Sequence, residues 1–424
     1  MSDTKVIHSS DTSGHIFSLF LKYVSANVLG MIGFSCYILA DTFFIAQTND
    51  TNLIAGVSLC APVFTTLMAF GNIYGQGGSS LISRMLGQNN LDGTARISAF
   101  SFYIAIATGA VLAVVMTLFR SPLLTLLGAS AETLDYAQSY YTVLTLCAPI
   151  IVLNFIHSNL VRCEGLANES MIGTILGAVV NIILDPILIS GLGMGALGAA
   201  VATVIGYLCS VMYFLLVLRK KSHCLSVKLS QCHVRADELR QILGVGITAA
   251  LSNLMQSLTV IVINQFLLAY GNDKIAAMGI VLKVNMIAQL ILTGFAFGGV
   301  PMYGYLYGAK QQDTLKKLLR FCLLFLCGLS LALTAFLCLA ATPLMRLFVQ
   351  DSALVATGAE MQRWQAATAV FAGIVLLLTV LFQATGKIVP HFCCQSAGRA
   401  SYSSLCLWSA SGCLPIMASS WRRL

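Results

Sequence analysis

Charged residues are scarce in this chain of 424 residues. Only 9% of the residues are Asp, Glu, Lys or Arg, whereas a soluble globular domain carries about 25%. So few charges cannot cover the surface of a water-soluble protein. The scarcity excludes a soluble enzyme, a disordered chain and a nucleic-acid-binding module, so the chain is not expected to be an enzyme or to have a nucleic-acid partner.

Several signals of common functional sites are also missing. The chain contains no Walker A pattern, so transport driven by ATP bound to this chain is excluded. The pairs His223-Cys224 and Cys232-His233 match no zinc-ligand spacing, and we expect a solvated loop there rather than a metal site. A signal peptide is not expected either, because the polar residues 1–14 are not followed by a short apolar region with a cleavage site. We therefore expect no cofactor other than a coupling ion, H+ or Na+.

What the chain has in abundance is apolar sequence. Hydrophobic residues make up 58% of it, the mean hydropathy is +0.85, and a membrane-spanning helix needs about 20 apolar residues. The apolar runs fall at 16–46, 54–75, 97–119, 136–158, 170–190, 195–218, 244–270, 276–300, 318–341 and 364–384. They predict an all-α polytopic membrane protein that resides in a lipid bilayer, here the cytoplasmic membrane.

The loop charges predict the orientation of these spans. Most basic residues of the loops follow even-numbered spans, and the loop at 219–243 is especially basic. The exceptions, in loops that follow odd-numbered spans, are Arg120, Lys274, Arg346 and Arg363. By the positive-inside rule, the N-terminus and the 219–243 loop lie in the cytoplasm.

The chain contains an internal repeat. Residues 41–50 recur as 264–273, and Gly77-Gly78 and Gly87 recur as Gly298-Gly299 and Gly308. We interpret these glycines as sites of close helix packing. The repeat predicts two homologous six-helix lobes related by an axis along the membrane normal, which is a known transporter plan. The predicted division is an N-lobe over 1–218, an inter-lobe loop over 219–243 and a C-lobe over 244–387, in a monomeric protein.

The repeat also exposes an anomaly at the end of the chain. Partners of the fifth and sixth spans are expected after residue 390, but residues 388–424 are rich in Ser, Cys and Trp and lack two apolar runs. We interpret this tail as out-of-frame sequence that replaces the last two helices. A natural short variant is the alternative, and a non-functional truncated transporter is one possible consequence.

Ionisable residues inside spans are costly and mark functional sites by default. Asp185 lies mid-span, shares a helical face with Asn181 one turn earlier, and precedes Pro186, which frees a backbone carbonyl. A carboxylate, an amide and a free carbonyl suit a proton or a small hard cation. Asp41, on one face with Tyr37, is the second candidate. The alternative is a purely structural role, in which Asp185 is a paired side chain at a capped kink of the helix.

Other polar residues of the spans give softer signals. Asn154 and Thr203 are more often interhelical hydrogen-bonding residues than ligands. Lys283 reaches either the outer interface or the cavity. We assign Lys283, Gln256 and Asn264 to a substrate cavity.

The ordered set of motifs resembles the multidrug and toxic compound extrusion (MATE) family. The motifs are Tyr37-Ile-Leu-Ala-Asp41, Ser83-Arg-Met-Leu-Gly87, Glu164-Gly165, Asn181-Ile-Ile-Leu-Asp185-Pro186 and Gly195-Ala-Leu-Gly198. The resemblance implies two six-helix lobes around a central cavity and export of mostly cationic drugs in exchange for H+ or Na+. It also implies an N-lobe cation site, whose matching positions are Tyr37, Asp41, Asn154, Asn181, Asp185 and Thr203.

A flippase for lipid-linked sugars is the alternative function. It would share the two-lobe plan, but several cavity-facing Arg or Lys residues are then expected to bind pyrophosphate. Only Lys283 qualifies, so the sequence favours the drug antiporter.

Overall fold

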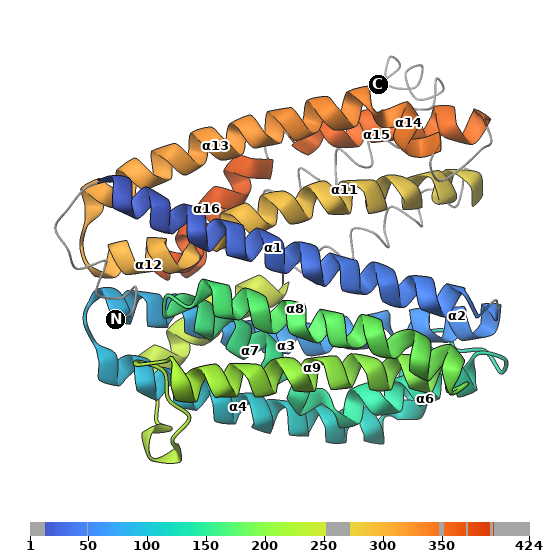
Figure 1. Ribbon diagram of the computed structural model, residues 1–424, viewed down its shortest axis with the longest axis horizontal. Coiled ribbons are helices and arrows are strands. Elements are labelled where there is room, and N and C mark those ends of the chain that lie inside the picture. The colour runs from blue at the N-terminus through green and yellow to red at the C-terminus, as the bar shows by residue number, and fades with distance from the viewer. Residues whose placement is uncertain are drawn as a thin grey trace, which may run out of the picture. The chain divides into compact units, whose positions relative to one another are not determined.

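The computed structural model describes residues 13–48, 50–251, 272–346, 352–369, 372–390 and 393. In this part of the chain every regular element is a helix (Figure 1). The elements are α1 (Ser13–Ala46), α2 (Thr51–Leu59), α3 (Ala61–Gly87), α4 (Leu91–Leu118), α5 (Arg120–Leu126), α6 (Leu134–Leu146), α7 (Ala148–Cys163), α8 (Ala167–Asp185), η2 (Pro186–Gly191), α9 (Gly195–Lys220), η3 (Leu229–Gln231), α11 (Asn272–Gly298), α12 (Val300–Gly308), α13 (Gln312–Leu339), α14 (Ala341–Arg346), α15 (Ser352–Ala369) and α16 (Ala372–Thr385).

The helices match the predicted spans and confirm the all-α polytopic class. Among the described residues, seven helices are long and apolar enough to cross a membrane, or up to nine if each bent pair is one span. A further helix over 236–251 runs up to the edge of the described part, and the rest of the predicted span 244–270 lies outside it. The tail at 388–424 also lies outside it, apart from 388–390 and 393, so its interpretation stays a prediction.

Local sequence explains where one of the spans bends. The α6–α7 span turns by 57°, and Pro149 stands in the first turn of α7. Proline lacks the N–H that would continue the helical ladder, so a helix bends or restarts there. By contrast α1 contains no proline and runs unbroken for 34 residues, about 51 Å at 1.5 Å per residue.

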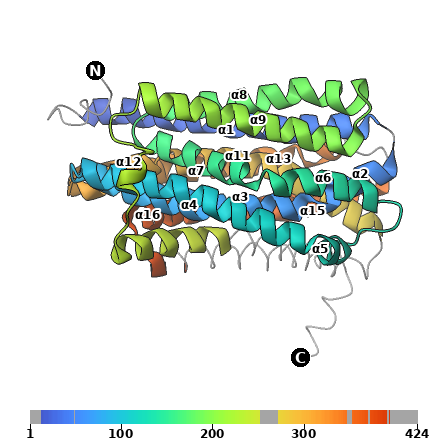
Figure 2. The ribbon, with the colours of Figure 1, turned by 90° about the horizontal axis from the view of Figure 1, so that it is seen from below.

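The chain divides into two compact units. The first comprises Met1–Ala250, Gly298–Gln311 and Ala384–Gly386, and the second comprises Leu251–Phe297, Gln312–Gln383 and Lys387–Leu424. In the first unit, α7 packs against α3, α4, α8 and α9, while α8 lies between α1 and α9. Figure 2 shows α8 and α9 running beside α1. Helix α7 is therefore the central helix of this unit.

Glycines of the internal repeat bring helices into close contact, as the sequence predicts. A Cβ atom on Gly87 of α3 would collide with the carbonyl oxygen of Tyr305 in α12, and one on Gly308 of α12 would collide with that of Arg84 in α3. Gly87 and Gly308 occupy equivalent positions of the repeat. Each packs against the other's helix, so the two repeated segments meet here with local two-fold symmetry.

The segment after α9 is docked on the first unit rather than freely solvated. Glu164, at the end of α7, is 5% exposed, and its Oε1 accepts the backbone N–H groups of His223 at 2.6 Å and Cys224 at 2.8 Å. The Tyr103 hydroxyl donates to the Val227 carbonyl at 3.0 Å. Cys224 is buried. The expectation of a solvated loop is therefore wrong for this part, because a buried carboxylate satisfies its backbone donors.

In the second unit, α15 packs against α13 and α14. Its small apolar core joins Val284, Ala288, Leu337 and Ala366. Near that core, the buried Asn285 Nδ2 donates to Gln362 Oε1 at 3.2 Å.

Candidate functional site

Helix α8 places two polar side chains in the interior of the first unit. Asn181 and Asp185 lie one turn apart, and both are buried, Asp185 completely. The Asn181 Nδ2 donates to Asp185 Oδ1 at 3.2 Å. Helix α8 ends at Asp185, and a π-helical turn starts at Pro186. The proline removes a backbone donor just beyond the carboxylate, and such π-turns are frequent at functional sites.

Helices α9 and α1 complete the polar cluster. The Asn181 Nδ2 also lies 3.5 Å from Thr203 Oγ1 on α9, and Thr203 is buried. The Tyr37 hydroxyl on α1 lies near the hydroxyls of Thr203 and Tyr207. Tertiary packing therefore brings residues of three helices to one point.

Asp41 adds a second carboxylate from α1. It follows Tyr37 by one turn and is partly exposed, although its Oδ1 is buried and makes no hydrogen bond in the described structure. Its carboxyl group interacts electrostatically with that of Asp185. Two like charges held within reach of each other repel. A proton or cation at this point relieves that repulsion.

The unsatisfied atoms around the two acids have one chemistry. Among the described residues, the buried atoms of this cluster without a hydrogen-bond partner are Asp41 Oδ1, Asn181 Oδ1 and Asp185 Oδ2. Every one of them is an oxygen that can accept a hydrogen bond or bind a cation. Buried polar groups normally have partners, so this surplus of oxygens fits a site that binds a positively charged ligand.

The chain also matches a family of known proteins. The MatE family model matches residues 27–187 and 248–397, which is more than half of the chain. The chain belongs to the MatE family, the MATE transporters.

Curated relatives in this family cover most of the chain. The "Multidrug export protein MepA" of Staphylococcus aureus (strain NCTC 8325 / PS 47) is 31% identical over 380 residues, which is 88% of this chain and 82% of the relative. The protein of the same name in Staphylococcus haemolyticus (strain JCSC1435) is 30% identical over 395 residues, which is 91% of this chain and 85% of the relative.

Solved MATE structures share the fold. One is described as the outward-facing conformation of a multidrug resistance MATE family transporter of the MOP superfamily. It superposes with a TM-score of 0.84 at 23% identity, over 92% of this chain and 93% of that one. A crystal structure of MATE in the bent conformation gives a TM-score of 0.82 at 23% identity, over 92% of this chain and 94% of that one.

Most predicted N-lobe positions of this MATE transporter come together in the structure. Tyr37, Asp41, Asn181, Asp185 and Thr203 form the polar cluster. Asn154 is buried on α7, which packs against α8 and α9, but in the described structure no hydrogen bond joins it to the others. The coupling role of all six residues remains a prediction.

The predicted substrate-cavity residues cannot be placed in the same way. Gln256 and Asn264 lie outside the described residues, and Lys283 is described only as part of the backbone of α11.

The structure adds aromatic residues that sequence reasoning missed. The Tyr207 ring on α9 lies 6.4 Å from that of Tyr37, 6.1 Å from Phe64 and 5.9 Å from Phe155, measured between ring centroids. Tyr140 on α6 is buried and interacts electrostatically with both acids. Tyr207 follows Thr203 by one turn, so a helical-face pattern could have found it. Tyr140 carries no such signal.

Proposed function

We propose that this MATE transporter is an antiporter that exports organic, mostly cationic drugs or toxins in exchange for H+ or Na+. The observation that carries the proposal is the acid pair, buried Asp185 and partly exposed Asp41, with unpartnered oxygens around it. The printed names of the relatives, multidrug export proteins, support the same function.

Exchange follows from competition for the acid pair. An ionised carboxylate buried without a partner costs several kcal/mol, so the pair is stable only when a proton, Na+ or a cationic cargo neutralises it. When the coupling ion enters from the outer side, it takes the place of the cargo. When the ion leaves on the inner side, the vacant charge attracts the next cargo. The two ligands are thereby coupled through one site.

The aromatic cluster beside the acids suits organic cations. The Tyr207 ring contacts those of Tyr37, Phe64 and Phe155, and the Phe64 and Phe155 rings also contact each other. Aromatic faces attract cations through their negative electrostatic potential and bury apolar surface at the same time. A flat drug with a delocalised positive charge satisfies both properties.

The proposal has a direct test. Everted membrane vesicles containing the chain are loaded with an imposed proton gradient or an imposed sodium gradient, and ethidium uptake is followed by fluorescence. We expect uptake with one gradient and none after that gradient is collapsed by the matching ionophore. Uptake that is indifferent to both gradients would contradict ion-coupled antiport. The proposed orientation, with the N-terminus and the 219–243 loop in the cytoplasm, is tested in the same vesicles by protease access to that loop.

A further inference from the structure

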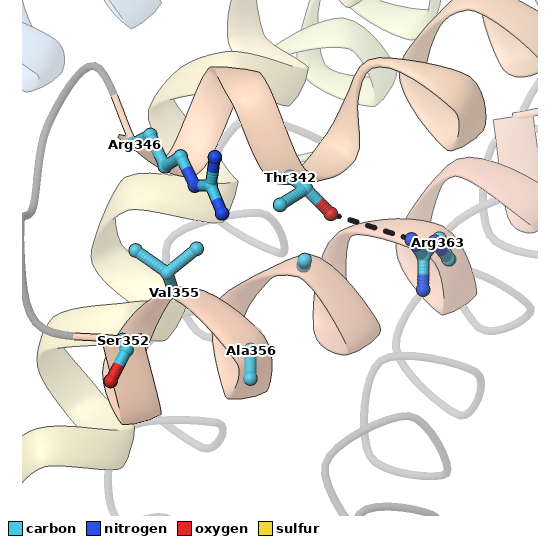
Figure 3. Close-up of a pocket in the computed structure, with 7 residues that line it drawn as sticks. Thr342, Arg346, Ser352, Val355, Ala356 and Arg363 are labelled. Atoms are coloured by element: carbon cyan, nitrogen blue, oxygen red, sulfur yellow. Dashed lines mark hydrogen bonds between the residues drawn. The ribbon is translucent and has the colours of Figure 1, made fainter.

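The second unit contains a cavity that the antiport mechanism does not use. It lies between α14 and α15, has a volume of about 630 Å³, and is of a size that accommodates small ligands. The residues that line it are Thr342, Arg346, Ser352, Val355, Ala356, Ala359 and Arg363. Figure 3 shows Arg346 reaching from α14 toward Val355 and Ala356, with Arg363 beside Thr342.

The charge of this cavity is positive. Its two arginines are exposed, and in the described part of the chain neither forms an ion pair with a carboxylate. Arg363 Nη2 donates only a long hydrogen bond, 3.5 Å, to Thr342 Oγ1. Ser352 begins α15, so the first backbone N–H groups of an 18-residue helix also face this end. Glu360 is exposed on α15 and does not line the cavity.

The position of the arginines is unusual for this chain. Only four basic residues fall in loops after odd-numbered spans, and two of these, Arg346 and Arg363, line one cavity. Guanidinium groups bind phosphate oxygens in bidentate fashion. A pair of them without carboxylate partners among the described residues is therefore a site for a phosphate ester or a similar anion.

The length of α13 places the cavity at the depth of lipid headgroups. Its basic residues end at Arg320, and residues 321–341 are uncharged. About 21 helical residues span ~32 Å, close to the ~30 Å hydrocarbon core of a bilayer. Thr342 then lies at the far boundary of the core, and the two guanidinium groups lie at the level of the phosphates.

Helix α13, which precedes α14 and packs against α15, exposes apolar side chains. Leu331, Phe336 and Leu339 of α13 are exposed, with Leu339 85% exposed. Acyl chains that run along this face would bring their headgroup to Arg346 and Arg363. The exposed apolar side chains of α13 favour a lipid over a soluble phosphate as the source of the anion.

We propose that Arg346 and Arg363 bind the phosphodiester of an anionic phospholipid, with its acyl chains against the exposed face of α13. The site is independent of the acid pair on α1 and α8. It recognises a charged headgroup at the end of the protein where basic residues are otherwise few.

Lipid binding to the purified full-length chain tests this proposal. Native mass spectrometry from detergent follows titrations with phosphatidylglycerol, with phosphatidylcholine and with inorganic phosphate. We expect phosphatidylglycerol to bind at least about tenfold more tightly than phosphatidylcholine, and inorganic phosphate not to displace it. Displacement by inorganic phosphate at millimolar concentration would overturn the lipid assignment in favour of a soluble anion.

Variants locate the site. Arg346→Gln with Arg363→Gln should weaken phosphatidylglycerol binding by about tenfold or more, whereas Arg320→Gln, at the opposite end of α13 and outside the cavity, should change it less than about twofold. Ala356→Trp retains both charges but fills the cavity, and it should cause a similar loss. Size-exclusion profiles verify folding. Unchanged phosphatidylglycerol affinity in Ala356→Trp, or in the folded double variant, would overturn the proposal.

Discussion

Replacing Asp185 with asparagine removes a charge from the acid pair and leaves its shape almost unchanged. In the structure the carboxylate is fully buried, its Oδ1 accepts one hydrogen bond from Asn181, and its Oδ2 has no partner in the described part of the chain. An asparagine carbonyl can retain that one bond. We therefore expect the free energy of unfolding to change by less than about 1 kcal/mol, which is the net worth of a typical hydrogen bond.

The effect on transport should be much larger. The amide cannot be ionised, so the attraction for the coupling cation, worth several kcal/mol for a buried charge, is lost. A loss of only about 2.8 kcal/mol is already a 100-fold weaker cation site. Gradient-driven ethidium transport by Asp185→Asn should therefore fall to the level of vesicles without the protein.

Reconstituted vesicles provide the measurement. Equal amounts of wild type, Asp185→Asn and Asp92→Asn are compared under the same imposed gradient. Asp92 is an exposed acid in the first turn of α4, so its amide variant tests for a general effect of removing one negative charge and should transport normally. Wild-type transport by Asp185→Asn at matched protein levels would refute the coupling role of the acid pair.

Three further predictions concern packing, pH and reactivity. Gly177→Ala inserts a Cβ that would lie 2.8 Å from a carbonyl oxygen of α9, so it should destabilise the protein by about 1–3 kcal/mol. The control Gly328→Ala, where nothing lies within 4 Å of the added Cβ, should be neutral or should stabilise the protein by up to about 1 kcal/mol. Equal shifts of the melting temperature of the two variants in detergent would contradict the packing at Gly177. A hydrogen bond from the Tyr136 phenol lowers the pKa of Asp50, and backbone N–H groups of α2 have a smaller effect in the same direction. The ionised Asp50 therefore stabilises the fold above pH ~4, and this stabilisation is lost as the pH falls through the lowered folded-state pKa. Thermal unfolding of Asp50→Ala, measured as a function of pH, should lack this step. Burial, and to a smaller extent the charge of Glu164, raises the pKa of Cys224 to about 11. Its reaction with maleimide at neutral pH should therefore be about 100-fold slower than that of an ordinary thiol. An unchanged rate in Glu164→Gln would contradict the contribution of the Glu164 charge.

Variants of Glu164 change both the charge near the Cys224 thiol and the docking of its loop. The carboxylate holds two backbone N–H groups of the segment that follows α9. The glutamine variant retains an acceptor but loses the negative charge, so it separates the electrostatic effect on the thiol from loss of the docked loop. Alanine at the same position should release the segment and speed labelling further.

The sequence by itself determined the class of the protein and half of its candidate site. Apolar runs of about 20 residues dictate membrane helices because lipid offers no partners for backbone polar groups. The proximity of Asn181 and Asp185 is a local property of one helix, since residues four apart share a face. The repeated glycines likewise predicted close helix contacts, which the packing of Gly87 and Gly308 confirms.

Only the tertiary structure decided which helices share a site. Nothing in the local pattern around Asp41 says that its carboxyl group lies within electrostatic reach of Asp185, or that Tyr140 of α6 lies within electrostatic reach of both. The docking of the backbone of Cys224 on Glu164 and the convergence of Arg346 and Arg363 on one cavity were equally hidden. Helical periodicity fixes neighbours one turn apart. Contacts between distant segments depend on how whole helix faces pack, which no short stretch of sequence encodes.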